Sequence, residues 1–140
     1  MAKDSSCFYC QRDSRLDDLM IEIAPLQVST LFLFREQTYH GRCLVAYKDH
    51  VKELFELDDE QLRLFMQDVK HAATAMQQAF SPDKVNYGAF SDTLAHLHFH
   101  LVPKYKDGPD WGGTFQMNPH KTYLSDAEYS ELVQAVRSCL

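Results

Sequence analysis

The sequence contains no apolar run of about 18 residues, the length a helix needs to cross a bilayer, and residues 1–6 lack the apolar segment of a secretory signal. It also contains no internal repeat, no low-complexity tract and no linker-like stretch. These absences argue against a transmembrane helix, an export signal, a repeat array and a string of tethered domains. We therefore predict one domain over residues 1–140 of a cytoplasmic protein that does not act at a membrane.

Positive charge is also scarce, with 14 lysines and arginines against 20 aspartates and glutamates and a net charge of -6. Nucleic acids and anionic membranes both favour a basic surface, so neither is expected as the main partner. A small anionic ligand stays possible, because it needs only a few local donors. The 45% hydrophobic and 24% charged content is typical of a soluble globular protein.

Only four cysteines are present, and two of them, Cys7 and Cys10, form a CxxC pair. In a chain that is not exported, such a pair more often belongs to a metal or redox site than to a disulfide. By itself it is a weak zinc signal, because a structural zinc site needs two further ligands. Cys43 and Cys139 are expected to be lone thiols, buried or half-buried.

The hydrophobic pattern predicts an α+β fold. Apolar residues recur at helical spacing over 58–80, where Asp58 and Gln61 resemble a capping box. Ser125 and Glu128 form a second such box, which opens a short C-terminal helix. Runs of apolar, β-branched and aromatic residues predict strands at 21–23, 28–34, 42–47, 85–90 and 94–102. This order favours a sheet with helices on one face.

The most informative stretch is HLHFHLV, residues 96–102. Side chains of a strand alternate between its faces, so His96, His98 and His100 share one face and the intervening apolar residues share the other. This pattern predicts a strand with one side in the core and three imidazoles toward a pocket. Two alternatives stay open, a surface strand with incidental histidines and a three-histidine metal site.

This stretch resembles the signature of the histidine-triad (HIT) family. The likeness extends to segments similar to other family motifs, at residues 44–50 (LVAYKDH), 85–88 (VNYG) and 102–105 (VPKY), and covers roughly residues 7–105. The resemblance implies a mostly antiparallel five-stranded sheet with one long helix and a short C-terminal helix. It also implies a homodimer in which two such sheets join edge to edge.

Displacement at the α-phosphorus of a nucleotide requires a nucleophile, neighbours that spread charge and help for the leaving group. The resemblance implies that His98 attacks to form a nucleotidyl-histidine, which water then hydrolyses. It places His100 at the phosphate oxygens and the hydroxyl of Thr93 near the leaving group. Asn86 matches an asparagine on the phosphate or ribose side. Simple capping of a turn or strand end is the alternative for Thr93 and Asn86.

The resemblance also supplies two further ligands for the CxxC pair. In zinc-containing members of the superfamily, the histidines that match His50 and His96 complete a Cys2His2 site with residues that match Cys7 and Cys10. Four protein ligands leave no open position on the metal, so such a Zn²⁺ is structural rather than catalytic. The alternative is two free thiols and a surface histidine at position 50.

The sequence departs from the family pattern at several positions. Arg42 stands where the family usually has a histidine near the site, and it is expected either to contact phosphate or to be solvated. The turn before the triad is shortened, with Asp92 where glutamine is common, which affects the leaving-group contacts. Glu36 is a candidate for binding the ribose hydroxyls, although an exposed loop glutamate is the simpler interpretation.

The leading hypothesis is an enzyme that binds a purine nucleotide and hydrolyses nucleoside phosphoramidates or dinucleoside polyphosphates. A nucleotidyltransferase is less favoured, because that branch of the family has glutamine where this chain has His100. A different class is a nucleotide-binding regulatory module whose turnover is incidental to partner binding. A zinc-storage or redox protein built on the CxxC pair would leave the triad unexplained.

Overall fold

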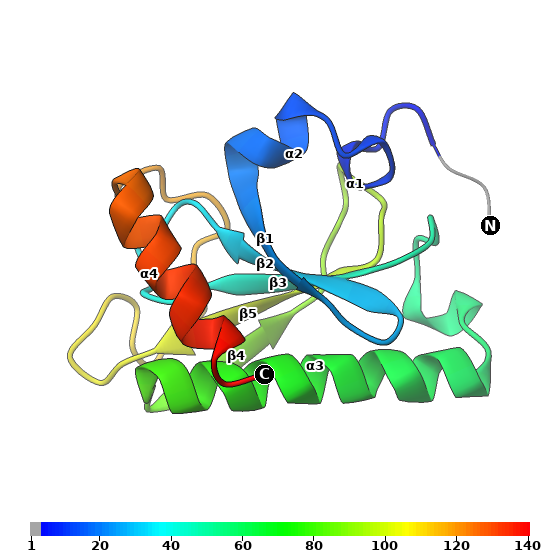
Figure 1. The fold of residues 1–140 in the computed structure, drawn as a ribbon. Helices are drawn as coiled ribbons and strands as arrows, with labels where there is room; N and C mark the ends of the chain where they lie inside the picture. The colour runs from blue at the N-terminus through cyan, green and yellow to red at the C-terminus, as the bar shows by residue number, and fades with distance from the viewer. Residues whose placement is uncertain (1–3) are drawn as a thin grey trace.

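The fold is built around one antiparallel sheet of five strands in the order β1-β2-β3-β5-β4 (Figure 1). The computed structural model describes residues 4–140. The strands are β1 (Met20–Pro25), β2 (Ser29–Phe34), β3 (Cys43–Tyr47), β4 (Lys84–Gly88) and β5 (His98–Lys104). This order leaves β1 and β4 as the edges of the sheet and puts β5, which carries two of the three histidines, between β3 and β4.

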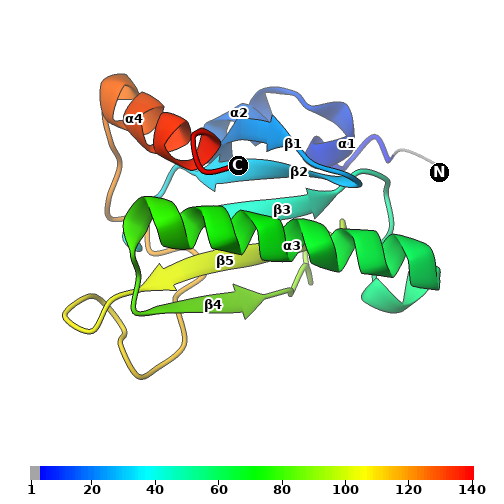
Figure 2. The ribbon, with the colours of Figure 1, turned by 60° about the horizontal axis from the view of Figure 1, so that its bottom comes forward.

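Helices cover both faces of the sheet (Figures 1 and 2). The long helix α3 (Asp59–Phe80) and the C-terminal helix α4 (Asp126–Arg137) lie on one face, and the short helices α1 (Phe8–Gln11) and α2 (Ser14–Leu19) lie on the other. A 3-10 turn, η1 (Leu54–Glu56), precedes α3. The α+β class is confirmed, but the expectation that helices occupy one face only is wrong. Among residues 4–140, no helix combines the length and the apolar character that a membrane crossing requires.

The long helix begins and ends where local sequence signals place its limits. The side chain of Asp58 accepts a hydrogen bond from the backbone N–H of Gln61, and the helix ends at Ser81, whose φ of 50° is left-handed. The predicted capping box is only half formed, because the side chain of Gln61 accepts instead from the hydroxyl of Tyr47 at 2.6 Å. The box of Ser125 and Glu128 at the start of α4 is fully formed.

Each face of the sheet carries an apolar cluster, and helices pack against both clusters. Along β2, Leu31 and Leu33 belong to the cluster under α3 and α4, whereas Phe32 and Phe34 belong to the cluster under α1 and α2. This alternation follows from the pleat of a strand. The second cluster reaches the CxxC segment through Cys7 and Tyr9. The N-terminal segment is therefore part of the wall on the histidine side of the sheet.

Strand β5 begins at His98, four residues later than the sequence predicts. Residues 94–97 form other backbone hydrogen bonds, including those from the N–H of Leu97 to the carbonyl of Val51 and from the N–H of Tyr47 to the carbonyl of Leu97. Within β5, His98 pairs with Ala46 and His100 with Leu44, on the face of the second cluster. His96 thus lies in the segment that leads into the strand, outside the regular ladder of β5.

Candidate active site and metal centre

A cavity of about 540 Å³ opens on the α1 and α2 side of the sheet, and both His98 and His100 line it. Its walls are largely apolar and aromatic. They come from the N-terminal helices, from β2 and β3, from the turn before β5 and from the segment after β5; they include Tyr9, Phe34, Leu44, Phe90 and Phe115. An apolar cavity with a few convergent polar groups is typical of a small-molecule site.

The ring of His98 is fixed by the backbone two residues before it. Its Nδ1 lies 2.7 Å from the carbonyl oxygen of His96, and a carbonyl oxygen can only accept a hydrogen bond. Nδ1 therefore carries the proton, and the neutral ring keeps its lone pair on Nε2. The hydroxyl of Ser91 lies 3.2 Å from the same Nδ1. His98 thus lines the cavity as a neutral imidazole whose nucleophilic nitrogen is the unprotonated Nε2.

The ring of His100 has the opposite arrangement. Its Nδ1 lies 3.1 Å from Nη2 of Arg42, and a guanidinium can only donate. Nδ1 is therefore the acceptor, and the neutral ring carries its proton on Nε2. The two cavity histidines have complementary roles as a result, since His98 has a lone pair to offer and His100 an N–H donor.

The third histidine, His96, belongs to a different group. Its Nε2 donates to the carbonyl oxygen of Tyr47 at 2.7 Å, which leaves the lone pair on Nδ1. That nitrogen lies 3.3 Å from Sγ of Cys7 and 3.3 Å from Nδ1 of His50. Within residues 4–140, the groups able to hold a metal include His96 but neither His98 nor His100. The alternative of a metal held by all three histidines therefore finds no support.

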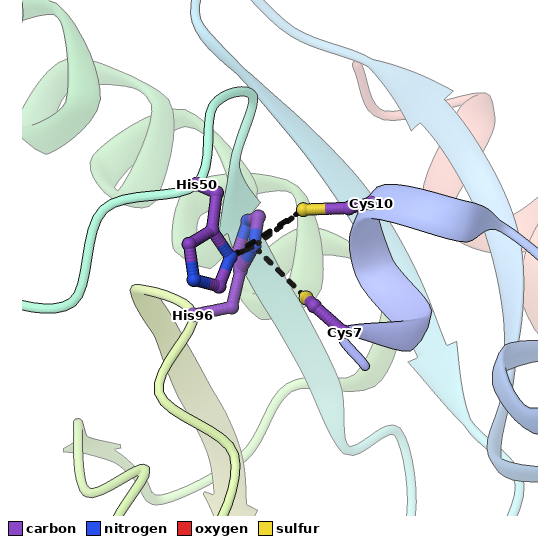
Figure 3. A group of neighbouring side chains, drawn as sticks. All are labelled: Cys7, Cys10, His50 and His96. Carbon is purple, nitrogen blue, oxygen red and sulfur yellow. Dashed lines mark hydrogen bonds between the residues drawn. The ribbon is translucent and has the colours of Figure 1, made fainter. Parts of the chain in front are cut away.

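Cys7, Cys10, His50 and His96 bring one ligand atom each to within 4.8 Å of one another (Figure 3). Atoms 2.0–2.3 Å from a tetrahedral zinc lie roughly 3.3–3.8 Å apart. Sγ of Cys10 lies 3.4 Å from Nδ1 of His50 and 3.7 Å from Nδ1 of His96, which matches this spacing. These four residues could therefore hold a metal ion.

The second ring nitrogen of each histidine in this cluster also has a partner that is typical of a metal site. Histidines that bind metals usually direct the other ring nitrogen to a carboxylate or a carbonyl. Nε2 of His96 donates a hydrogen bond to the carbonyl oxygen of Tyr47, and Nε2 of His50 lies 3.7 Å from a carboxylate oxygen of Asp4. Both rings thus direct Nδ1 toward the thiols.

Burial keeps the cavity histidines neutral. It lowers the pKa of His98 below the usual histidine value of 6.5. It lowers the pKa of His100 to about 3, with additional electrostatic contributions from Arg42 and His98. Removal of an ion from water favours the uncharged form of the group. Both rings are therefore neutral near pH 7, the state in which an imidazole can act as a nucleophile.

Thr93 and Asn86, two of the other predicted site residues, line two neighbouring cavities. Thr93 is exposed and lines the histidine cavity. Asn86 lines a neighbouring cavity of about 350 Å³, and its amide oxygen lies 3.5 Å from Nζ of Lys104. The two cavities share wall residues, among them Phe90 and Phe115.

Arg42 and Glu36 are both buried, contrary to the interpretation of either one as a solvated residue. Arg42 is 0% exposed and lies behind His100, outside the residues that line the cavity. The carboxylate of Glu36 accepts hydrogen bonds from the backbone and hydroxyl of Thr38 and from the backbone N–H groups of Lys121 and Thr122. Its oxygens tie the segment before α4 to the end of β2, so few acceptor positions remain for a ribose.

Sequence reasoning missed several residues that shape the site. The ring of Tyr9 packs against His96 and His98, with centroid distances of 5.0 and 5.2 Å. Ser91, at a left-handed φ of 66°, brings its hydroxyl to His98. Tyr9 lies inside the CxxC pair and Ser91 inside the shortened turn. Their positions next to recognised motifs were the only available signals.

Comparisons with known proteins agree with this geometry. The family model of the HIT domain matches residues 24–107. The adenosine 5'-monophosphoramidase of Schizosaccharomyces pombe is 25% identical over 138 residues, 92% of this chain and 99% of that protein.

Solved structures show the same fold at lower identity. A histidine triad protein of Sinorhizobium meliloti superimposes with a TM-score of 0.83 at 20% identity, covering 91% of this chain and 95% of the other. A zinc-bound histidine triad family protein of Mycobacterium smegmatis superimposes with a TM-score of 0.65 at 20% identity, covering 96% and 92%.

The depressed pKa of His100 predicts how stability changes with pH. Between the unfolded value of 6.5 and the folded value of about 3, the unfolded chain binds the additional proton, so acidification favours unfolding. From pH 7 to pH 5 this group should reduce the free energy of unfolding by about 2 kcal/mol. Denaturant melts of the wild type and His100→Gln isolate the contribution, because the other titrating groups are common to both. Equal pH slopes for the two proteins would contradict the prediction.

Proposed function

This chain belongs to the HIT family, and from that premise we propose that it is a hydrolase that cleaves at the α-phosphorus of nucleoside phosphoramidates or dinucleoside polyphosphates. His98 is the proposed nucleophile. The fission yeast relative, a named adenosine 5'-monophosphoramidase, supports phosphoramidates as the first substrates to test. The cytoplasmic location stays a prediction from the sequence.

One observation carries this proposal: the hydrogen bonds of the two cavity histidines set their protons in complementary positions. The carbonyl of His96 holds the proton of His98 on Nδ1, and Arg42 holds that of His100 on Nε2. A phosphoryl group in the cavity would therefore meet a lone pair from one ring and an N–H donor from the next. The ring centroids are 5.1 Å apart, which allows both to act on one phosphorus centre.

The proposed reaction has two displacement steps. Nε2 of His98 attacks the α-phosphorus, the bond to the leaving amine or phosphate breaks, and the leaving group takes the electron pair. The developing positive charge on the ring is stabilised by the carbonyl of His96 through Nδ1–H. Water then attacks the same phosphorus and loses a proton to the solvent, the bond to His98 breaks with its electron pair returning to Nε2, and a nucleoside monophosphate is released.

The proposed roles of the other cavity residues follow from their positions. His100 donates from Nε2–H to the phosphate oxygens. Thr93 lines the same cavity and is exposed, so its hydroxyl is the proposed hydrogen-bond donor to the leaving group. The aromatic and apolar wall, which includes Tyr9 and Phe34, is the proposed site for a purine base. Asn86 is the proposed contact for the part of the substrate that extends into the neighbouring cavity.

We also propose that Cys7, Cys10, His50 and His96 hold one structural Zn²⁺. Two thiols and two imidazoles are a donor set that zinc prefers, and four protein ligands leave no open position for substrate. The zinc-bound relative from Mycobacterium smegmatis supports this choice of metal. A metal bound here would fix the N-terminal segment against the sheet and hold His96, whose carbonyl orients His98.

A regulatory nucleotide-binding module is the second candidate. It would use the same cavity, and the aromatic walls favour ligand binding whether or not turnover matters to the cell. Incubation with adenosine phosphoramidate, diadenosine polyphosphates and a nucleotide sugar, with the products resolved by mass, separates the candidates. Hydrolysis of the first two supports the hydrolase, transfer from the third supports a nucleotidyltransferase, and binding without turnover supports the module.

Replacement of His98 by asparagine should reduce phosphoramidate hydrolysis to below about 1% of the wild-type rate, since loss of a covalent path costs several powers of ten. The variant should stay folded by circular dichroism, because His98 lines a cavity. His71→Asn, on the exposed face of α3, is the matched control and should retain the wild-type rate. A folded His98→Asn protein with more than this residual turnover would count against a nucleophilic role.

The freshly purified protein should contain about one zinc per chain, and a chelator should lower its melting temperature, because metal binding contributes folding free energy. Replacement of Cys7 and Cys10 by serine should remove the metal but leave measurable hydrolysis. Cys139→Ser, a half-buried thiol outside the cluster, is the control. A metal content near zero after zinc supplementation would rule out this zinc site. A folded double-serine protein without any activity would instead give the metal a part in the chemistry.

A homodimer joined through edge strand β4 is the proposed assembly, because unpaired edge strands favour pairing with another chain. Beside β4, an apolar groove of about 670 Å³ runs along α3, and the exposed Tyr87 lies in it. Light scattering should give about twice the 16.2 kDa of one chain, and Tyr87→Glu should shift the protein toward monomer. A wild-type monomer at micromolar concentration would rule out this arrangement.

A further inference from the structure

Arg42 is a buried cation with an unusual environment. Its side chain is fully buried, and within residues 4–140 no carboxylate forms an ion pair with it. Among the described residues, its Nε is the one buried side-chain nitrogen or oxygen atom that has no hydrogen-bond partner. Buried cations are normally paired, so this one requires an explanation.

Arg42 lies directly before β3 and follows a tight turn at Gly41. Gly41 has a φ of 88°, and a Cβ at this position would lie 2.4 Å from the ring of Phe80. Only glycine fits such a conformation at such close approach. Arg42 is the next residue, and its guanidinium contacts the rings of Phe34 and Phe115.

Three kinds of contact hold the guanidinium in place. Its Cζ lies 4.3 Å from the ring centroid of Phe34 and 5.2 Å from that of Phe115, within the range of cation–π contacts. Nη1 donates to the carbonyl of Gln116 at 3.2 Å, and Nη2 donates to Nδ1 of His100 at 3.1 Å. Together these contacts place Nη2 against Nδ1 of His100.

We propose that Arg42 is a positioning residue that acts through His100: it fixes the proton of that ring on Nε2, so that an N–H donor is available at the phosphate-binding wall of the cavity. This inference rests on the proposed function. It replaces the expectation that Arg42 touches phosphate directly, since Arg42 does not line the cavity. His100 stands between the guanidinium and the cavity and transmits its effect.

The charge of Arg42 also acts on His100. Burial lowers the pKa of Arg42 to about 10 and the charge of Glu36 opposes that shift, so the guanidinium stays protonated near pH 7 and disfavours a second positive charge on the neighbouring ring. His100 accordingly stays neutral, and the charge of Arg42 contributes to that state. A phosphoryl group in the cavity would receive a hydrogen bond from His100, whose donor is already oriented by Arg42, which is the kind of preorganisation that lowers a transition-state barrier.

A purely structural role for Arg42, as a clamp on Gln116 and the Phe115 segment, makes different predictions. A clamp would change stability but would not select one tautomer of His100. The direct readout is the long-range proton–nitrogen NMR spectrum of the imidazoles in the ligand-free protein. In the wild type the proton of His100 should sit on Nε2. In Arg42→Met the Nδ1-protonated form should appear, because no donor faces Nδ1.

Arg35→Met is the matched control for this spectrum. Arg35 also donates to a backbone carbonyl, that of Asp17, and packs on an aromatic ring, that of Tyr129, but it lies outside the cavity. Its replacement should leave the tautomer of His100 unchanged. If Arg42→Met does not fold, Arg42→Lys serves instead, because an ammonium also only donates and should keep the proton on Nε2. A wild-type His100 with its proton on Nδ1, or an unchanged tautomer in a folded Arg42→Met, would overturn the proposal.

Kinetics then test whether the effect passes through His100. Arg42→Met should lower kcat for adenosine phosphoramidate by roughly ten- to hundredfold, up to the loss that removal of one preorganised donor causes. In a His100→Ala background the same substitution should cost less than about threefold, since interacting residues are non-additive. Full additivity would indicate an independent, direct role and would contradict the proposal. If the wild type has no hydrolase activity, the proposed function fails, and the spectrum still decides the Arg42–His100 relationship.

Discussion

The hydrogen bond from Nδ1 of His98 to the carbonyl of His96, at 2.7 Å, is the constraint on which the proposed chemistry depends. A carbonyl cannot donate, so the bond determines which nitrogen of the ring is protonated and which keeps its lone pair. Without it, a buried neutral imidazole would distribute its proton between both nitrogens. With it, the nitrogen available for attack is Nε2, and the reaction proposed here needs no prior deprotonation at neutral pH.

His96 links this constraint to the metal cluster. The same residue gives its backbone carbonyl to His98 and its side-chain Nδ1 to the group formed with Cys7, Cys10 and His50. A metal in this cluster would therefore support the residue whose carbonyl orients the proposed nucleophile, without contacting the substrate itself.

The sequence predicts those parts of the fold whose causes are local. The long helix is predicted almost to the residue because its cap, Asp58, and the Ser81 region that ends it are both coded within a few positions. The burial of Glu36 and Arg42 could not be predicted, because their partners are remote in sequence: Glu36 accepts from residues 85 and 86 positions away, and Arg42 contacts His100 58 positions away. The later start of β5 has the same origin, since Leu97 bonds to Val51 and Tyr47 outside a regular ladder.

The most direct test of this account is the site of covalent attachment during turnover. Rapid quenching of the wild type with adenosine phosphoramidate, followed by digestion under non-acidic conditions and fragmentation by mass spectrometry, should find one acid-labile adenylyl group. The account predicts that it is bonded to His98 and that it forms and decays at rates consistent with kcat. An adduct on His96 or His100, or continued turnover with no adduct at any quench time, would contradict the assignment of protons from which the mechanism is derived.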